Sequence, residues 1–99
     1  MSSYRLTPAA RQDLSEIWDY TAERWDESQA GRYLTELRAA AERIAEDPRR
    51  GRACDEVRPG YRRYAIGSHV LFYRERSDGQ AGADIIRVLH QSMDPTRRV

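Results

Sequence analysis

The feature that most constrains this chain is a change of hydrophobic period near its middle. Before residue 48, apolar residues recur at spacings of three and four, which is typical of amphipathic helices. After residue 60, aromatic and β-branched residues form short runs separated by turns that contain glycine, which is typical of strands. Helices followed by strands within 99 residues predict a single α+β domain that covers residues 1–99.

Two apolar stripes predict two helices. The first follows Thr7 and Pro8, a capping residue and a proline suited to the first helical position. The second ends before Pro48, because the residue that precedes a proline is driven out of helical geometry. Only residues 26–28 separate the stripes, so the helices must form an antiparallel hairpin. The stripes consist of Ala10, Leu14, Ile17, Trp18, Thr21 and Trp25, then of Ala30, Tyr33, Leu34, Leu37, Ala41 and Ile44.

The side chains on the first stripe are expected to face the core. This expectation includes Trp18 and Trp25, because tryptophans at helical spacing are more often core residues than binding residues. Acidic residues such as Asp13 lie mostly outside the stripe and are expected on the surface.

Residues 61–66 and 69–74 predict a β-hairpin. Only Gly67-Ser68 separates the two runs, and glycine at the first position of a two-residue link indicates a type II′ turn. A further turn at 77–82 leads to a third strand at 84–90. These strands predict a three-stranded antiparallel meander.

The remaining segments complete the predicted architecture. Residues 4–7 can form a short N-terminal strand, and residues 48–60 are expected to be an irregular connector rich in proline, glycine and arginine. The order is an N-terminal strand, an antiparallel helix hairpin and a three-stranded meander, which form one sheet with the hairpin packed on it. Alternation gives the meander two faces, one against the helices and one partly exposed with aromatic residues and arginines.

The net charge of +1 hides an asymmetry along the chain. Residues 1–57 hold 9 arginines against 12 acids, whereas residues 58–99 hold 8 arginines against 4 acids. The basic second part therefore favours an acidic partner. All 17 basic residues are arginine, which can contact carboxylate or phosphate through two parallel hydrogen bonds.

The residues do not assemble into a recognisable chemical site. Cys54 is the only cysteine, and the two histidines, His69 and His90, lack metal-ligand spacing. Ser68 lies in a turn rather than in a nucleophile elbow, and no glycine-rich phosphate loop is present. We therefore expect no catalytic residue, no metal and no cofactor. Without a leader or an apolar span, a cytoplasmic protein that binds other macromolecules is expected.

The arginines of the second part leave three interpretations open. They can form a phosphate-binding surface for nucleic acid, a docking surface for an acidic protein segment, or a solvated edge that prevents aggregation. The arginines concerned are Arg62, Arg63, Arg74, Arg87, Arg97 and Arg98.

Taken together, these segments resemble the ParE branch of the RelE/ParE toxin superfamily from Tyr4 to Asp94. The order and spacing of the motifs carry the resemblance more than any single motif does. The motifs are Leu6-Thr7-Pro8-Ala9-Ala10, Leu14 to Ile17-Trp18-Asp19-Tyr20, Asp47-Pro48-Arg49-Arg50-Gly51-Arg52, Arg58-Pro59-Gly60-Tyr61-Arg62, Gly67-Ser68-His69-Val70-Leu71-Phe72-Tyr73-Arg74 and Ile86-Arg87-Val88-Leu89-His90.

The resemblance implies the toxin of a type II toxin–antitoxin system. Such a toxin inhibits DNA gyrase by binding, without a reaction of its own, and a ParD-like antitoxin neutralises it. The antitoxin carries a ribbon-helix-helix part, so the toxin meets operator DNA only indirectly, and no membrane is involved. On this basis the gyrase-binding residues are expected to be Arg62, Arg74, Arg87, His90 and Arg97, and the antitoxin-binding residues Tyr33, Leu37, Arg63 and Tyr73.

Two other functions remain open. Relatives of the RelE type cleave messenger RNA on the ribosome, and they usually carry an arginine where this chain has Val70. Their basic tail and tyrosine are replaced here by Gln91-Ser92-Met93-Asp94, which also counts against a nuclease. The third possibility is a non-toxic copy that only binds the antitoxin and takes part in operon control.

Overall fold

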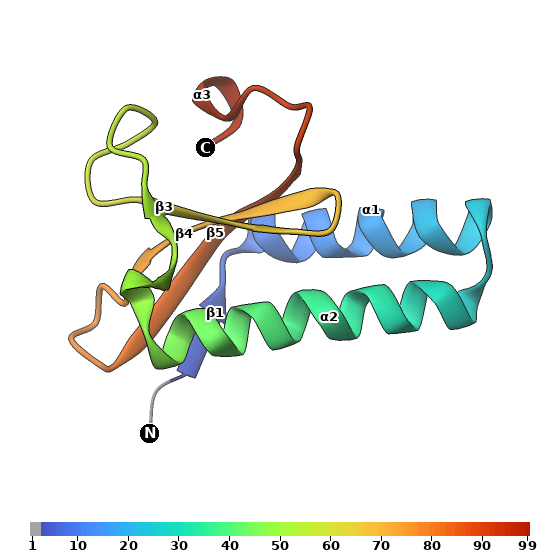
Figure 1. Cartoon of the computed structure of the whole chain (residues 1–99), viewed down its shortest axis with the longest axis horizontal. Coiled ribbons are helices and arrows are strands. Elements are labelled where there is room, and N and C mark those ends of the chain that lie inside the picture. Colours follow the sequence, from blue (N-terminus) through green and yellow to red (C-terminus); the bar gives the residue numbers. More distant parts are fainter. Residues whose placement is uncertain (1–2) are drawn as a thin grey trace.

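The helix hairpin forms where the two stripes predict it. In the computed structural model, which describes residues 3–99, α1 spans Pro8–Arg24 and α2 spans Glu27–Glu46 (Figure 1). The Thr7 hydroxyl accepts the backbone N–H of Ala10 at 3.0 Å, which caps α1 as expected. Asp26 caps α2 in the same way through the N–H of Gln29 at 2.7 Å.

The sheet is larger than the predicted meander. It contains five strands in the order β1-β5-β4-β3-β2, and the outer strand β1 runs parallel to β5. The predicted meander is therefore the centre of a mixed sheet, and the connector supplies an edge strand and a short 3-10 helix, η1. The bounds are β1 Ser3–Leu6, η1 Pro48–Arg50, β2 Arg52–Ala53, β3 Arg62–Ile66, β4 His69–Glu75, β5 Gly82–His90 and α3 Pro95–Arg98.

The turn between β3 and β4 has the predicted type. Gly67 has a φ angle of +56°, and no residue other than glycine has a positive φ within residues 3–99. Ser68 therefore has a negative φ, whereas a type I′ turn needs a positive φ at both central positions. Figure 1 shows this β-hairpin lying beside α1.

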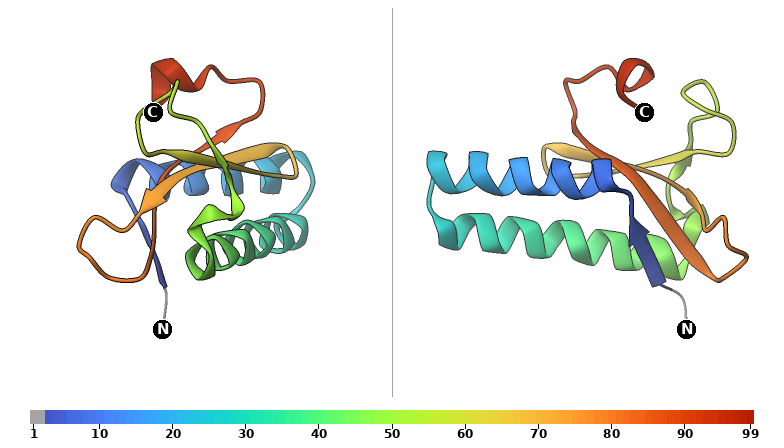
Figure 2. Two further views of the ribbon diagram at one scale, coloured as in Figure 1. Left: turned by 60° about the vertical axis from the view of Figure 1, so that its left-hand side comes forward. Right: turned by 180° about the vertical axis from the view of Figure 1, so that it is seen from behind.

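The sheet buries apolar side chains on both faces. The face toward the helices carries Leu71, Tyr73 and Ile85 in the main core. The opposite face, predicted to be partly exposed, instead buries Val70 and Phe72 in a second cluster. The loop before β3 and the C-terminal segment lie over this face and cover it (Figure 2). The prediction of a partly exposed face holds at Ala65, but it was wrong at Val70 and Phe72 because neither covering segment has a periodic apolar pattern.

The predicted burial along α1 was also wrong at three positions. Trp18 and Trp25 are 37% and 69% exposed, whereas Asp13 is only 6% exposed. The hairpin extends past the end of the sheet, so the last turns of α1 have no layer above them (Figure 1). Asp13 lies where α1 crosses β5, and an arginine of that strand neutralises it.

Tyr73 connects the sheet to the end of the helix hairpin. Its buried hydroxyl accepts the N–H of Gly51 at 2.8 Å and donates to the carbonyl of Pro48 at 2.7 Å. Tyr73→Phe leaves both backbone groups unpaired and is expected to lower the free energy of unfolding by about 1–3 kcal/mol. Urea denaturation measures this loss. Tyr64→Phe is the matched control, because the structure gives the Tyr64 hydroxyl no hydrogen bond within residues 3–99, and equal losses in both variants would contradict the prediction.

Candidate functional site

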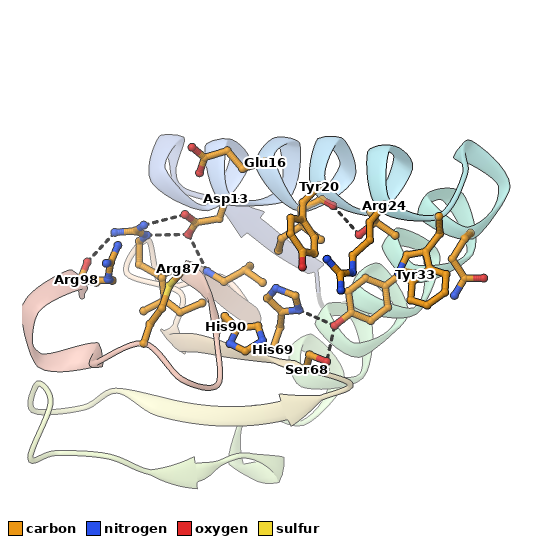
Figure 3. A pocket seen from close by; sticks show the side chains of 17 residues that line it. Asp13, Glu16, Tyr20, Arg24, Tyr33, Ser68, His69, Arg87, His90 and Arg98 are labelled. Atoms are coloured by element: carbon orange, nitrogen blue, oxygen red, sulfur yellow. Dashed lines mark hydrogen bonds and ion pairs between the residues drawn. The ribbon is translucent and has the colours of Figure 1, made fainter.

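The candidate site is a groove of about 630 Å³ between α1 and one end of the sheet. It forms where the helix hairpin extends beyond the strands, and Figure 3 shows it from close by. Its polar and aromatic lining comes from four parts of the chain. These are Glu16, Tyr20 and Arg24 on α1, Tyr33 on α2, His69 and His90 on β4 and β5, and Met93 and Arg98 in the C-terminal segment.

One face of α1 forms the wall of the groove. Asp13, Glu16, Tyr20 and Arg24 are separated by three or four residues, so they lie in one row along the helix. The Arg24 guanidinium lies 5.9 Å from the centroid of the Tyr20 ring. Tyr20 is 63% exposed, and an exposed tyrosine beside an arginine is typical of a protein-binding surface.

Two histidines form the floor. His69 and His90 are paired directly across β4 and β5, and their ring centroids lie 5.5 Å apart in an edge-to-face arrangement. Tyr33 packs against the other side of His69, with ring centroids 5.5 Å apart. The strand register, which no sequence motif reveals, thus brings together the only two histidines of the chain.

Hydrogen bonds hold His69 in one neutral form. The Tyr33 hydroxyl accepts the N–H of Ser68 at 3.1 Å and lies 2.6 Å from Nδ1 of His69. When Tyr33 donates to Nδ1, all three groups are satisfied and the ring proton resides on Nε2. Burial lowers the pKa of His69, and the neighbouring His90 lowers it further, which favours this neutral form.

His90 is held in the same tautomer by a different residue. The backbone N–H of Ser92 donates to Nδ1 of His90 at 3.1 Å, and the Ser92 hydroxyl lies 2.7 Å from the same nitrogen. A nitrogen that accepts an N–H cannot carry a proton, so the proton of neutral His90 also resides on Nε2. Both rings therefore keep one N–H donor that these contacts do not use.

An ion pair closes one end of the groove. The Arg87 guanidinium binds both carboxylate oxygens of Asp13 at 2.7 Å, and the same carboxylate accepts the N–H of Val88 at 2.9 Å. The hydrogen bond to Asp13 raises the pKa of Arg87. Arg87 also donates to the carbonyl of Arg98 at 2.8 Å, which ties the C-terminal segment to the sheet.

The five residues predicted to bind gyrase are spread over several parts of the molecule. Only Arg87 and His90 line the groove. Arg74 lies on β4 roughly 17 Å from His69 at 3.3 Å per residue, and Arg62 pairs with Tyr73, roughly 13 Å from His69 along the strand. Arg62 donates to the carbonyl of Gly51 at 2.8 Å, and Arg97 is exposed on α3. Gyrase binding by these five residues stays a prediction. Their spread was not visible in the sequence, because alternation assigns a face but not a position along the sheet.

The residues predicted to bind the antitoxin divide in the same way. Tyr33 lines the groove, but Leu37 and Tyr73 are 1% and 0% exposed and belong to the core. These two side chains offer no surface to a partner, so their prediction was wrong. Arg63 lies over the Phe72 ring on the opposite face of the sheet, at 5.2 Å.

Sequence reasoning missed much of the groove, although part of the signal is present. The polar row on α1 follows helical spacing, and it could have indicated a second functional face. Tyr20 and Arg24 belong to that row and line the groove, as does His69, for which the sequence predicted no function.

A shallower hollow on the outer side of the hairpin, beside Trp18, is lined by apolar residues with Arg11 and Arg38.

Neither a metal-ligand cluster nor a membrane-spanning helix occurs among residues 3–99. Within residues 3–99, no three histidine, cysteine, aspartate or glutamate side chains gather closely enough to hold a metal ion. None of the helices in that part of the chain has the length and apolar character needed to cross a bilayer.

The neutral form of His69 makes stability depend on pH. The pKa of His69 is lowered in the folded chain, so below about pH 6.5 the unfolded chain binds a proton that the folded chain resists. The free energy of unfolding is therefore expected to decrease from about pH 7.5 to about pH 5.5. His69→Asn retains an acceptor for Tyr33 without titrating, and it should lose less stability over this range in urea denaturation. A loss as large as that of the unaltered chain would contradict this assignment.

Comparison with known proteins identifies the family. Residues 4–95 match the family described as the ParE toxin of a type II toxin–antitoxin system, parDE. The chain is 54% identical over 98 residues to "Toxin ParE1" of Mycobacterium tuberculosis, covering 99% of this chain and 98% of that protein. It is 49% identical over 94 residues to "Toxin ParE1" of Caulobacter vibrioides, covering 95% of this chain and 94% of that protein.

A solved structure shows the same fold. The structure titled "Chromosomal ParDE TA system from P. aeruginosa" superposes with a TM-score of 0.75 at 17% identity, covering 91% of this chain and 96% of that chain. The family match and the two relatives named Toxin ParE1 confirm the resemblance seen in the sequence at the level of the family. The chain belongs to the ParE family of type II toxin–antitoxin toxins.

Proposed function

We propose that this ParE-family toxin inhibits DNA gyrase by binding and is neutralised by a ParD-like antitoxin. The observation that carries the proposal is the near full-length similarity to proteins named Toxin ParE1, within a family described by its parDE system. The groove supports it, since exposed aromatic residues beside arginines are the composition that protein interfaces favour. The toxin then acts in the cytoplasm and contacts operator DNA only through the antitoxin.

The groove also supports a simple mode of neutralisation. Tyr33, expected on the antitoxin-binding surface, and His90, expected on the gyrase-binding surface, line the same groove. An antitoxin segment seated there excludes any other protein from these residues. Neutralisation then requires only occupation of the groove, without a change in the fold of the toxin.

A nuclease of the RelE type fits the structure less well. The strand position at which such toxins carry an arginine is occupied by Val70, which is 7% exposed in the second core cluster. Val70 does not line the groove, so this position supplies no cation to it. A ribosome-dependent nuclease needs cations to stabilise the charged phosphorane.

Purified toxin is expected to make gyrase accumulate cleaved plasmid DNA in the presence of ATP, and addition of the antitoxin should suppress this effect. The measurement is a supercoiling and cleavage assay resolved on agarose gels. Toxin mixed beforehand with antitoxin is the control. An unaffected gyrase at saturating, folded toxin would contradict the proposal. Cleavage of messenger RNA without DNA damage would then favour the nuclease, and unaffected growth would favour a non-toxic copy.

A further inference from the structure

The two histidines on the floor of the groove have a property that the proposed function does not explain. Each Nδ1 is occupied, in His69 by the Tyr33 hydroxyl and in His90 by Ser92. Each ring therefore has its Nε2–H as the one remaining polar group. Within residues 3–99, the structure gives neither Nε2 a hydrogen-bond partner, yet neither is among the buried polar atoms without a partner. Neither N–H group is therefore fully buried, and both rings line the groove.

The surrounding charges favour an anion at this position. Arg87 is neutralised by Asp13, which removes the negative charge nearest to the histidines. The remaining charged groups that line the groove are Arg24 and Arg98 against Glu16 alone. Two N–H donors in a groove that two arginines also line attract a carboxylate, because carboxylate oxygens only accept hydrogen bonds.

The apolar side chains that line the groove indicate which residues of the ligand lie next to its acidic residue. Tyr20 and Trp25 are 63% and 69% exposed, and Met93 is 40% exposed. From Asp13 to Trp25, α1 provides a wall roughly 18 Å long at 1.5 Å per residue. An extended segment of about five or six residues spans this length at 3.3 Å per residue. The matching ligand is thus a short segment with an acidic residue flanked by apolar ones.

We infer that His69 and His90 form a carboxylate-binding pair, in which both Nε2–H groups donate to an acidic side chain of the antitoxin seated in the groove. The inference rests on the proposed antitoxin partner and assigns the central contact of that interface. Tyr33, Ser68 and Ser92 act as positioning residues, since they hold both rings with the proton on Nε2. Arg24 and Arg98 provide the flanking charge.

The test uses the fact that the amide nitrogen of glutamine occupies the place of Nε2, whereas the amide of asparagine occupies the place of Nδ1. The variant H69N/H90N therefore loses both proposed donors but retains groups that can bond to Tyr33 and Ser92. The variant H69Q/H90Q retains both donors and loses those internal contacts. The two variants have the same charge. They differ in whether the amide takes the place of Nδ1, as in H69N/H90N, or of Nε2, as in H69Q/H90Q.

The dissociation constant of full-length toxin and the antitoxin encoded beside it is measured by titration calorimetry. We expect H69N/H90N to bind about 100-fold more weakly, since each lost hydrogen bond to a charged group lowers affinity by about tenfold or more. We expect H69Q/H90Q to bind within about threefold of the unaltered toxin. In thermal unfolding, the asparagine variant should have the higher midpoint temperature of the two, because it retains the internal contacts to Tyr33 and Ser92. The order of stability is then the opposite of the order of affinity. This reversal of order distinguishes binding from a merely structural role.

A second measurement follows the ring protons directly. In ¹⁵N-edited spectra of the free toxin, both rings should carry the proton on Nε2, and antitoxin binding should protect both protons from exchange with water. Substituting the antitoxin's acidic residues one at a time by their amides should identify one position that weakens binding to the unaltered toxin but not to H69N/H90N.

The outcomes separate this inference from the proposed function. Antitoxin binding that is equally strong for unaltered toxin and H69N/H90N would overturn the histidine pair and leave the toxin–antitoxin pairing intact. Weaker binding by the glutamine variant than by the asparagine variant would overturn it as well. Failure of the unaltered, folded toxin to bind the antitoxin would overturn the partner itself, and with it both proposals.

Discussion

Replacing Arg87 with alanine is expected to lower the free energy of unfolding by about 3–5 kcal/mol, because it leaves a buried carboxylate without its counter-charge. The side chain of Asp13 is 7% exposed, and Arg87 binds both of its oxygens at 2.7 Å. The same substitution releases the carbonyl of Arg98 and loosens the C-terminal segment. Urea denaturation followed by circular dichroism measures the loss.

A double variant tests the cause of this loss. In D13N/R87M no charge remains buried, and the asparagine oxygen can still accept the N–H of Val88. This variant is expected to be more stable than R87A, although it has lost more of the original side chains. If R87A were as stable as the unaltered chain, the ion pair would have no structural role. A loss of toxicity in R87A therefore reports on folding as well as on target contact, which makes Arg24 and Arg98 the better positions for testing the groove.

Gly82→Ala is expected to detach the N-terminal strand. Gly82 has a φ angle of +127° at the start of β5, and a Cβ there would overlap the carbonyl oxygen of Ser3 in the parallel neighbour β1. The backbone strain alone amounts to about 1–3 kcal/mol, and the overlap forces β1 to move in addition. Hydrogen exchange should show lost protection in β1, and denaturation should show a lower free energy of unfolding.

Gly79→Ala is the matched control in the same turn. Gly79 has a φ angle of +80°, but a Cβ there would meet no atom within 4 Å. This variant is expected to lose only the cost of a positive φ, about 1–2 kcal/mol, with protection in β1 retained. Equal losses of stability and of β1 protection in the two variants would contradict this prediction. They would show that glycine is not needed at position 82 because of the close approach of β1.

Part of the site could be predicted from the sequence, for a physical reason. The groove wall lies on α1, where residue spacing alone determines which side chains share a face. The helix bounds also followed from local chemistry, since Thr7 and Pro48 act on the adjacent backbone. The histidine pair could not be found this way, because 21 residues separate His69 and His90 and only the register of β4 against β5 makes them neighbours.

The sequence by itself determined the family, the two long helices and the β-hairpin at Gly67, whereas β2, η1 and α3 appeared only in the structure. Periodicity, capping and turn chemistry act over a few residues and are visible in any window of the chain. Only the tertiary structure decided that β1 pairs with β5 in parallel and that Asp13 is buried against Arg87. It also decided that Leu37 and Tyr73 are buried whereas Trp25 is exposed. These outcomes depend on which surfaces of the helix hairpin and the sheet meet, and on how far the hairpin extends beyond the sheet. No local sequence pattern contains this information.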